Sequence, residues 1–273
     1  MLQKTPDREI TEASEITEAS EITESYELLN PYGRADVVLI CEHASNHIPD
    51  EFDRLGLDPS HLELHIAWDI GMAAITRTLS ARLNAPALLA RFSRLLIDPN
   101  REPDHKTLIP EISDGITIPG NQALTPAERE QRLNRFYRPF HERAERLVRD
   151  RKWAGHVPLV CGMHSFTPVM NGVRRPWHAG MLWNRDPRLA RELIHRLQHK
   201  HGLMVGDNKP YSGQDLFHTM NRHGADHGFP QVTIEIRQDE ILDESGQRRW
   251  SEILYQELAE LQQQPDLKKI QHY

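Results

Sequence analysis

Histidine and glutamate side chains stand at the ends of apolar, strand-like segments in three separate parts of the chain. His43 and His164 come just after two of these segments, and Glu235 lies near the end of a third. In open α/β sheets ligands bind at the carboxyl ends of the strands, so residues far apart in sequence can meet there. Two imidazoles can bind a catalytic metal ion, and a nearby carboxylate can move the proton of an activated water. The pattern therefore favours a metal-dependent hydrolase.

Asp69 is the candidate for a third metal ligand, because a catalytic zinc takes about three protein ligands and keeps one position open for water. Asp69 also opens a helical segment, so the alternative is that its side chain caps the first turn of that helix. For His43 and His164 the alternative is a hydrogen-bonded place in the core. The residue types alone leave these alternatives open.

Glu235 carries the clearest signal, because a carboxylate within the apolar run 231–236 is costly to bury unless it is paired or functional. Arg237 lies two residues further along the same strand face and is the partner of Glu235 if the role is structural. Otherwise Arg237 is a candidate for substrate binding. Ser165 follows His164 without the flanking glycines of a nucleophile elbow, which argues against a serine nucleophile. Ser165 is also one of the candidates for substrate binding.

Two arginines frame the segment 93–101. A guanidinium can hold a carboxylate through two parallel hydrogen bonds, so Arg94 or Arg101 could bind an acidic substrate. The alternative is an arginine that pairs within the chain, with Asp98 or Asp104.

Composition and charge exclude several other classes of protein. Residues 1–27 carry a net charge of −6 out of the total of −7, so the rest of the chain is nearly neutral and shows no basic stripe for nucleic acid. No apolar stretch reaches the roughly 18–20 residues of a membrane-spanning helix. The GxSxG motif and the glycine-rich motifs of nucleotide binding are absent. Cys41 and Cys161 lie within apolar runs, which favours a reducing cytoplasm over a disulfide framework.

The periodicity of the apolar residues predicts an α/β domain behind these side chains. It predicts strands over 37–41, 86–92, 159–163, 179–183 and 231–236, and helices over 68–84, 125–150, 187–202 and 248–264. Alternating strands and helices predict a mostly parallel or mixed sheet flanked by helices. Residues 9–25 repeat the unit EITEAS, so we expect an acidic, poorly ordered tail over 1–28 and a single domain over 29–273.

Six motifs follow one another in a fixed order over roughly 36–240. They read CEHASN (41–46), AWDIG (67–71), SRLLIDPNR (93–101), HSFTP (164–168), NKPYSG (208–213) and IEIRQD (234–239). Together they resemble the N-formylglutamate amidohydrolase family. The resemblance implies a zinc-hydrolase fold similar to that of metallocarboxypeptidases and aspartoacylases, a mixed eight-stranded sheet within three α/β/α layers.

Carried over motif by motif, the resemblance also implies roles for single residues. His43 and His164 match the histidines that bind one zinc ion. Glu235 takes the place of the catalytic strand glutamate, and Asn100 with Arg101 resembles the pair that grips the carboxylate of the substrate.

One position departs from the relatives. They take a glutamate ligand three residues after the first histidine, where this chain has Asn46. The third ligand must then come from elsewhere. We prefer Asp69 to Glu42, because Glu42 directly precedes His43 and would need an awkward turn to share its metal.

These assignments predict hydrolysis of the amide bond of a small N-acyl amino acid, preferably an N-formyl one such as N-formylglutamate, which gives formate and the free amino acid. Glu235 would move the proton of the water, and Arg94 would stabilise the tetrahedral oxyanion. The expected partner is a small acidic substrate, with no nucleic acid and no membrane. The alternatives are a deacylase of the same fold that acts on another N-acyl amino acid or a peptide end, and a non-catalytic protein that binds an acidic metabolite.

Overall fold

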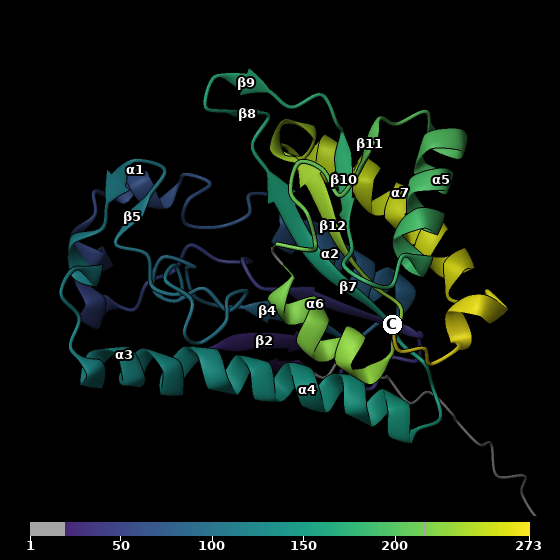
Figure 1. Ribbon diagram of the computed structural model, residues 1–273, viewed down its shortest axis with the longest axis horizontal. Helices are drawn as coiled ribbons and strands as arrows, with labels where there is room; N and C mark the ends of the chain where they lie inside the picture. Colours follow the sequence, from purple (N-terminus) through teal and green to yellow (C-terminus); the bar gives the residue numbers. More distant parts are fainter. Residues whose placement is uncertain (1–19, 216) are drawn as a thin grey trace, which may run out of the picture.

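The apolar run Val37–Cys41 forms strand β3 in the middle of an eight-stranded sheet, and every residue of the strand is buried. Val37, Leu39 and Cys41 join the hydrophobic cluster on one face of the sheet, whereas Val38 and Ile40 join the cluster on the other face. A strand covered on both faces needs the continuous apolar run that the sequence shows. The computed structural model describes residues 20–215 and 217–273 (Figure 1).

The sheet is mixed and has the strand order β1-β2-β4-β3-β7-β12-β10-β11. Its central pairs β4–β3, β3–β7 and β7–β12 are parallel, and so is β10–β11, whereas β1–β2, β2–β4 and β12–β10 are antiparallel. The strands are β1 (Glu21–Ile22), β2 (Tyr26–Leu29), β3 (Val37–Cys41), β4 (Ala87–Ala90), β7 (Leu159–Phe166), β10 (Ala179–Leu182), β11 (Val205–Asp207) and β12 (Gln231–Arg237).

Helices cover both faces of this sheet and complete the three α/β/α layers that were predicted (Figure 1). Helices α2, α5 and α7 pack on one face, and α4 and α6 pack on the other. The helices are α1 (Pro59–Leu62), α2 (Met72–Leu83), α3 (Pro126–Arg132), α4 (Arg138–Trp153), α5 (Arg188–His201), α6 (His218–His223) and α7 (Glu244–Leu261). Two small hairpins, β5 (Ile112–Ser113) with β6 (Ile116–Thr117) and β8 (Val169–Met170) with β9 (Val173–Arg174), stand apart from the sheet. No helix in the described ranges 20–215 and 217–273 has the length and apolar character needed to cross a membrane.

The acidic tail differs from the expectation at its end. Residues 20–28 were expected to belong to a poorly ordered segment, but Tyr26–Leu29 forms strand β2 and pairs with β4. Tyr26 and Leu28 are buried there, so the end of the tail alternates between inward and outward side chains as an edge-side strand does. The remaining part of that prediction, over 1–19, lies outside the described residues.

Helix α2 begins four residues later than expected, at Met72 instead of residue 68. Gly71 is its N-cap and has a left-handed backbone with φ of 84°. A side chain at this position would meet the carbonyl oxygen of Ile241, because a Cβ would lie 2.6 Å from it. Only glycine suits such a conformation and such a close approach. The late start keeps Asp69 in the loop ahead of the helix.

Candidate active site

The three strand ends that were predicted to converge do lie together. Strands β7 and β12 are parallel neighbours in which Glu235 is the register partner of His164. His43 follows the end of β3, which is the neighbour of β7 on its other side. All three residues line one cavity of about 260 Å³ at the carboxyl ends of these strands. The fold therefore brings reactive side chains from distant parts of the chain into one cavity, as expected for ligand sites in α/β sheets.

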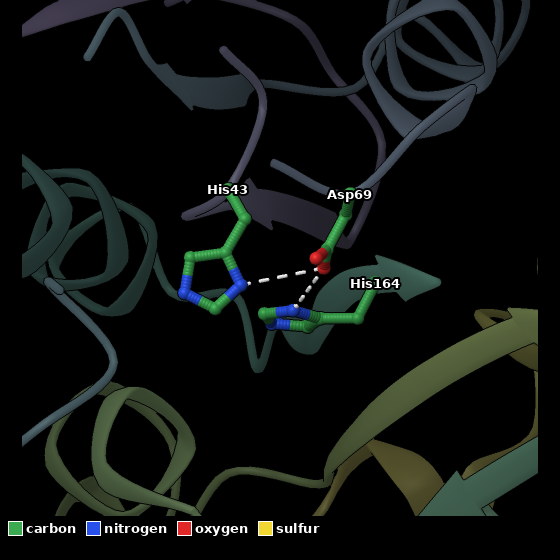
Figure 2. Close-up of side chains that lie close together, drawn as sticks. All are labelled: His43, Asp69 and His164. Atoms are coloured by element: carbon green, nitrogen blue, oxygen red, sulfur yellow. Dashed lines mark hydrogen bonds and ion pairs between the residues drawn. The ribbon is translucent and has the colours of Figure 1, made fainter. Parts of the chain in front are cut away.

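His43, Asp69 and His164 form a tight buried group in this cavity (Figure 2). Asp69 Oδ2 lies 2.8 Å from His164 Nδ1 and 3.3 Å from His43 Nδ1. The possible ligand atoms of the three residues all lie within 4.8 Å of one another. Imidazole nitrogen and carboxylate oxygen are donors that zinc prefers, so the donor set fits a divalent cation.

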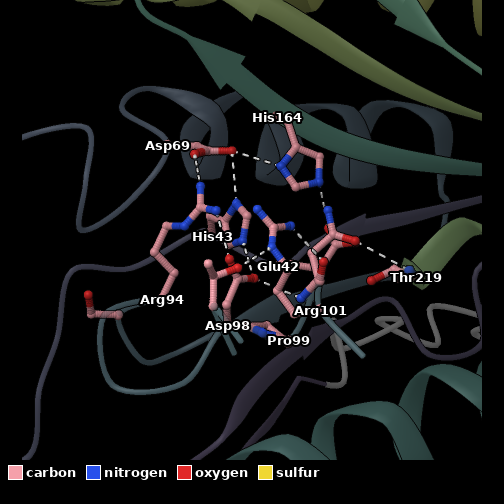
Figure 3. A network of polar contacts seen from close by, with 12 residues as sticks. Glu42, His43, Asp69, Arg94, Asp98, Pro99, Arg101, His164 and Thr219 are labelled. Carbon is pink, nitrogen blue, oxygen red and sulfur yellow. Dashed lines mark hydrogen bonds and ion pairs between the residues drawn. The ribbon is translucent and has the colours of Figure 1, made fainter. Parts of the chain in front are cut away.

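Two further carboxylates lie beside the opposite nitrogens of the two imidazoles, one in a hydrogen bond and one at ion-pair distance (Figure 3). Asp98 Oδ1 lies 2.8 Å from His43 Nε2, and Glu42 Oε2 lies 3.0 Å from His164 Nε2. Both carboxylates are almost fully buried. A carboxylate on the far nitrogen of a ligating histidine fixes the tautomer and the orientation of the ring. Each ring can thus present Nδ1 towards Asp69.

Asp69 serves this group and caps no helix, since the N-cap of α2 is Gly71. Its backbone N–H donates to the carbonyl of His43, which ties the two loops together. Its Oδ2 also accepts from the backbone N–H of Ser165 at 3.3 Å. Glu42 lies on the other side of the His164 ring, so the geometry favours Asp69 over Glu42 as the third donor.

Charge in this group is concentrated on buried carboxylates. Burial opposes ionisation of Asp69, but His43 and His164 outweigh it and hold the pKa of this carboxyl well below its usual range. Burial likewise opposes protonation of His164, but Glu42 and Asp69 outweigh it and hold the pKa of this imidazole well above its usual range. The protein therefore builds a negative environment around the donor atoms, which stabilises positive charge there.

Glu235 stands in the same cavity with very different surroundings. Its side chain is buried, and Oε2 has no hydrogen-bond partner among the described residues. Burial raises the pKa of Glu235 to about 7. A carboxyl group with a pKa near neutrality can both accept and return a proton.

The predicted substrate-binding residues divide into two groups. Arg94, Asn100, Arg101 and Ser165 line the cavity. Arg94 pairs with Asp98 at 2.7 Å, as the alternative interpretation of the sequence allowed. Asn100 Oδ1 accepts from the backbone N–H of a residue in α6, and the guanidinium of Arg101 donates to its own segment, to Thr107 Oγ1 and the Asn100 carbonyl.

Arg237 is placed differently and corrects our expectation. It does not belong to the cavity lining in the described part of the chain, and it makes no ion pair with Glu235 there. Its guanidinium donates to the carbonyls of residues 175–177 and pairs with Asp239 and Glu240. Arg237 lies on the same strand face as Glu235 but beyond the cavity, where it fixes the following loop.

Sequence reasoning missed part of the cavity wall. Tyr211 belongs to the NKPYSG loop, which the sequence allowed over a pocket, but no role was assigned to it or to Gln238, which follows Arg237. Gln238 donates to Ser165 Oγ at 3.3 Å and so holds the segment beside Asp69. The other unpredicted lining residues are His65, Phe166, Thr167, Met170, Leu182 and Thr233.

Glu42→Gln is expected to weaken metal binding by about 10- to 100-fold without abolishing it, because Glu42 orients His164 without contacting the donor atoms. Equilibrium dialysis against a zinc buffer measures the affinity. An exposed glutamate on α7, Glu244, offers a matched control, and Glu244→Gln should bind zinc as the wild type does. Complete loss of zinc from Glu42→Gln would instead identify Glu42 as a ligand.

Fold and site together define an α/β protein with a buried carboxylate–histidine centre at the strand ends, the layout of a hydrolase. The chain belongs to the N-formylglutamate amidohydrolase family, since the model of that family matches residues 35–242. The resemblance noted in the six motifs is thereby confirmed. A comparison with curated proteins finds no match.

Two crystal structures are similar to this chain. A gene product of Agrobacterium tumefaciens is 37% identical with a TM-score of 0.84, over 86% of this chain and 94% of that chain. The N-formylglutamate amidohydrolase from Ralstonia eutropha JMP134 is 19% identical with a TM-score of 0.65, over 88% of this chain and 97% of that chain. The second likeness supports the fold alone.

Proposed function

We propose that this protein hydrolyses the amide bond of a small N-acyl amino acid, in particular an N-formyl amino acid such as N-formylglutamate. Water is consumed, the C–N bond breaks, and formate and the free amino acid are released. Family membership supports an amidohydrolase. The observation that carries the proposal is the buried, unpaired Glu235 in the same cavity as the His43–Asp69–His164 group.

His43, Asp69 and His164 would hold one zinc ion per chain. When bound, zinc supplies a Lewis acid that lowers the pKa of a water and polarises the amide carbonyl. Asp98 and Glu42 hold the two histidine rings in place for this purpose.

Glu235 is the proposed general base and then the general acid. Its carboxylate takes a proton from the attacking water and returns it to the nitrogen of the leaving amine, which cannot depart as an anion. A pKa of about 7 suits both steps, because neither form of the carboxyl is then strongly favoured at neutral pH. Burial also keeps bulk water from competing for that proton.

Arginines in the cavity wall would hold the charged parts of the substrate. Arg101 with Asn100 would bind the carboxylate of the amino acid, since a guanidinium and an amide both donate to carboxylate oxygens. Arg94, kept in position by Asp98, would stabilise the oxyanion that forms at the attacked carbonyl. Ser165 belongs to the wall beside Asp69.

The unpaired buried thiols of Cys41 and Cys161 support a cytoplasmic location.

Formate release from N-formyl-L-glutamate by the zinc-loaded protein, with and without a chelator, tests the proposed function. We expect formate that disappears on chelation and returns when zinc is added back. Formate production that is insensitive to chelation would contradict the metal role. If protein that holds zinc releases no formate, the same assay with N-acetyl amino acids and blocked peptides distinguishes a deacylase of other substrates from a protein that only binds its ligand.

A further inference from the structure

A second cavity of about 290 Å³ continues from the catalytic one. The two cavities share His65, Arg94, Arg101 and Met170 in their walls, so they meet at the two arginines. A ligand with its carboxylate at Arg101 therefore has space on both sides. One side leads to the His–Asp–His group, and the other leads away from it.

The wall of this second cavity is partly apolar and partly charged. Its apolar members are Ile66, Leu95, Pro110, Ile112 and Met170, and its titratable members are His65, Arg94, Asp98, Arg101 and Asp114. Leu95 and Ile66 are buried in its wall, whereas Ile112 of β5 and Met170 of β8 are 62% and 39% exposed at its edge. These two come from separate hairpins, β5–β6 and β8–β9, that are distant in sequence (Figure 1). Exposed apolar side chains that gather around a concave site are typical of a surface that an apolar part of a ligand covers.

Charge in the two cavities suits one carboxylate and disfavours a second. Arg94 is engaged by Asp98 at 2.7 Å and by Asp69 at 3.9 Å (Figure 3). Arg101 has no carboxylate within ion-pair distance among the described residues, and it donates only to the neutral acceptors Thr107 Oγ1 and the Asn100 carbonyl there, so its charge is the less neutralised of the two. Asp114, half exposed, adds a negative charge to the wall of the second cavity. A glutamate side chain in that cavity would meet Asp114, and the second guanidinium of the wall, Arg94, is already paired with Asp98.

We infer that the preferred substrate is an N-acyl amino acid with one carboxylate and an apolar side chain; this inference rests on the proposed function and narrows it. The α-carboxylate binds Arg101, the amide lies towards Glu235, and the side chain enters the second cavity between Ile112 and Met170. N-formylglutamate fits the same site but brings a second carboxylate to the second cavity, so it is expected to be the poorer of the two kinds of substrate. An apolar pocket penalises even a missing methylene by about 10- to 200-fold, and a charged group without a partner costs more, so a preference of at least about tenfold is expected.

The experiment compares kcat/KM of the zinc-loaded protein for N-formyl-L-methionine, N-formyl-L-leucine and N-formyl-L-glutamate. We expect both apolar substrates to exceed the glutamate derivative by at least about tenfold. Ile112→Lys, which introduces a cation at an exposed position, should reverse this order, whereas Ile112→Met should retain it. Ile22→Lys makes the same change at a similarly exposed isoleucine on β1 and should leave the ratio unchanged.

Ligand binding separates a failure of this inference from a failure of the proposed function. Thermal stabilisation of each variant by the three ligands reports affinity without turnover. If no ligand yields formate, the proposed hydrolysis is rejected. The inferred specificity is retained in that case if the apolar ligands stabilise the wild type more than N-formyl-L-glutamate does and Ile112→Lys reverses this order. A wild-type preference for N-formyl-L-glutamate, in turnover or in binding, or a ratio that Ile112→Lys does not change, would overturn the inference.

Discussion

Glu235→Gln is expected to lower kcat by about 10²- to 10⁴-fold, the range that a positioned general base contributes. Glutamine has nearly the same shape as glutamate but cannot take a proton from water. Because Glu235 is not one of the His43–Asp69–His164 donors, the variant should still hold one zinc ion per chain. Steady-state kinetics and the zinc content of the same preparation measure both quantities.

The matched control for this variant is Glu244→Gln, which replaces an exposed glutamate that pairs with Arg248 on α7. It should keep full activity. Loss of zinc from Glu235→Gln would reassign Glu235 as a metal ligand, and a kcat within a few-fold of the wild type would remove it from the proton transfer.

Glu235→Gln is also expected to change how the stability of the metal-free protein depends on pH. Burial raises the pKa of Glu235 from 4.5 to about 7, so the folded state binds a proton between these values that the unfolded state has released. Stability then falls as pH rises through this window, by roughly 1.4 kcal/mol per pH unit and about 3 kcal/mol in all. Glu235→Gln removes the effect. Urea unfolding near pH 5 and pH 7.5 should show that the free energy of unfolding of the variant, relative to the wild type, is higher at pH 7.5 than at pH 5. The same difference at both pH values would contradict a raised pKa of the Glu235 carboxyl.

Asp69→Asn is expected to abolish metal binding, and with it turnover. A single oxygen of Asp69 lies against Nδ1 of both His43 and His164, so the side chain is the centre of the donor group. The amide of asparagine removes the negative charge and is a much weaker ligand for zinc. We expect less than about a tenth of the wild-type zinc content after dialysis and activity at the background level.

Glu42→Gln gives the comparison for Asp69→Asn, since both replace a buried carboxylate that touches His164. Glu42→Gln should weaken zinc binding, and Asp69→Asn should abolish it. Equal effects in the two variants would mean that the carboxylates act through charge alone. Zinc retained by Asp69→Asn at the wild-type affinity would exclude Asp69 as a ligand.

The parts of the site that the sequence predicted are those that depend on strand periodicity. His43, His164 and Glu235 lie next to or within continuous apolar runs, and such runs mark both the buried strands and their ends. Strand β2 was missed because Tyr26–Leu29 follows an acidic repeat whose composition outweighed a short apolar alternation.

The parts that were missed depend on distance and direction in space. Asp98 and Glu42 reach the far nitrogens of the histidines, but a sequence does not show which way an imidazole turns. The alternation of side chains along β12 correctly placed Arg237 on the face of Glu235. It could not show that the cavity ends before Arg237, whose charge is used by Asp239 and Glu240.

The carboxylates around the two imidazoles also determine how many protons the site binds. Glu42 and Asp69 on either side of the ring raise the pKa of His164 well above its usual range, which favours a protonated ring in the protein without a metal. A histidine must lose that proton before its Nδ1 can become a ligand. Uptake of the proposed cation would therefore release at least one proton into the solvent. In a calorimeter the heat of loading would change with the ionisation enthalpy of the buffer, and acid would release the cation by refilling the same nitrogen.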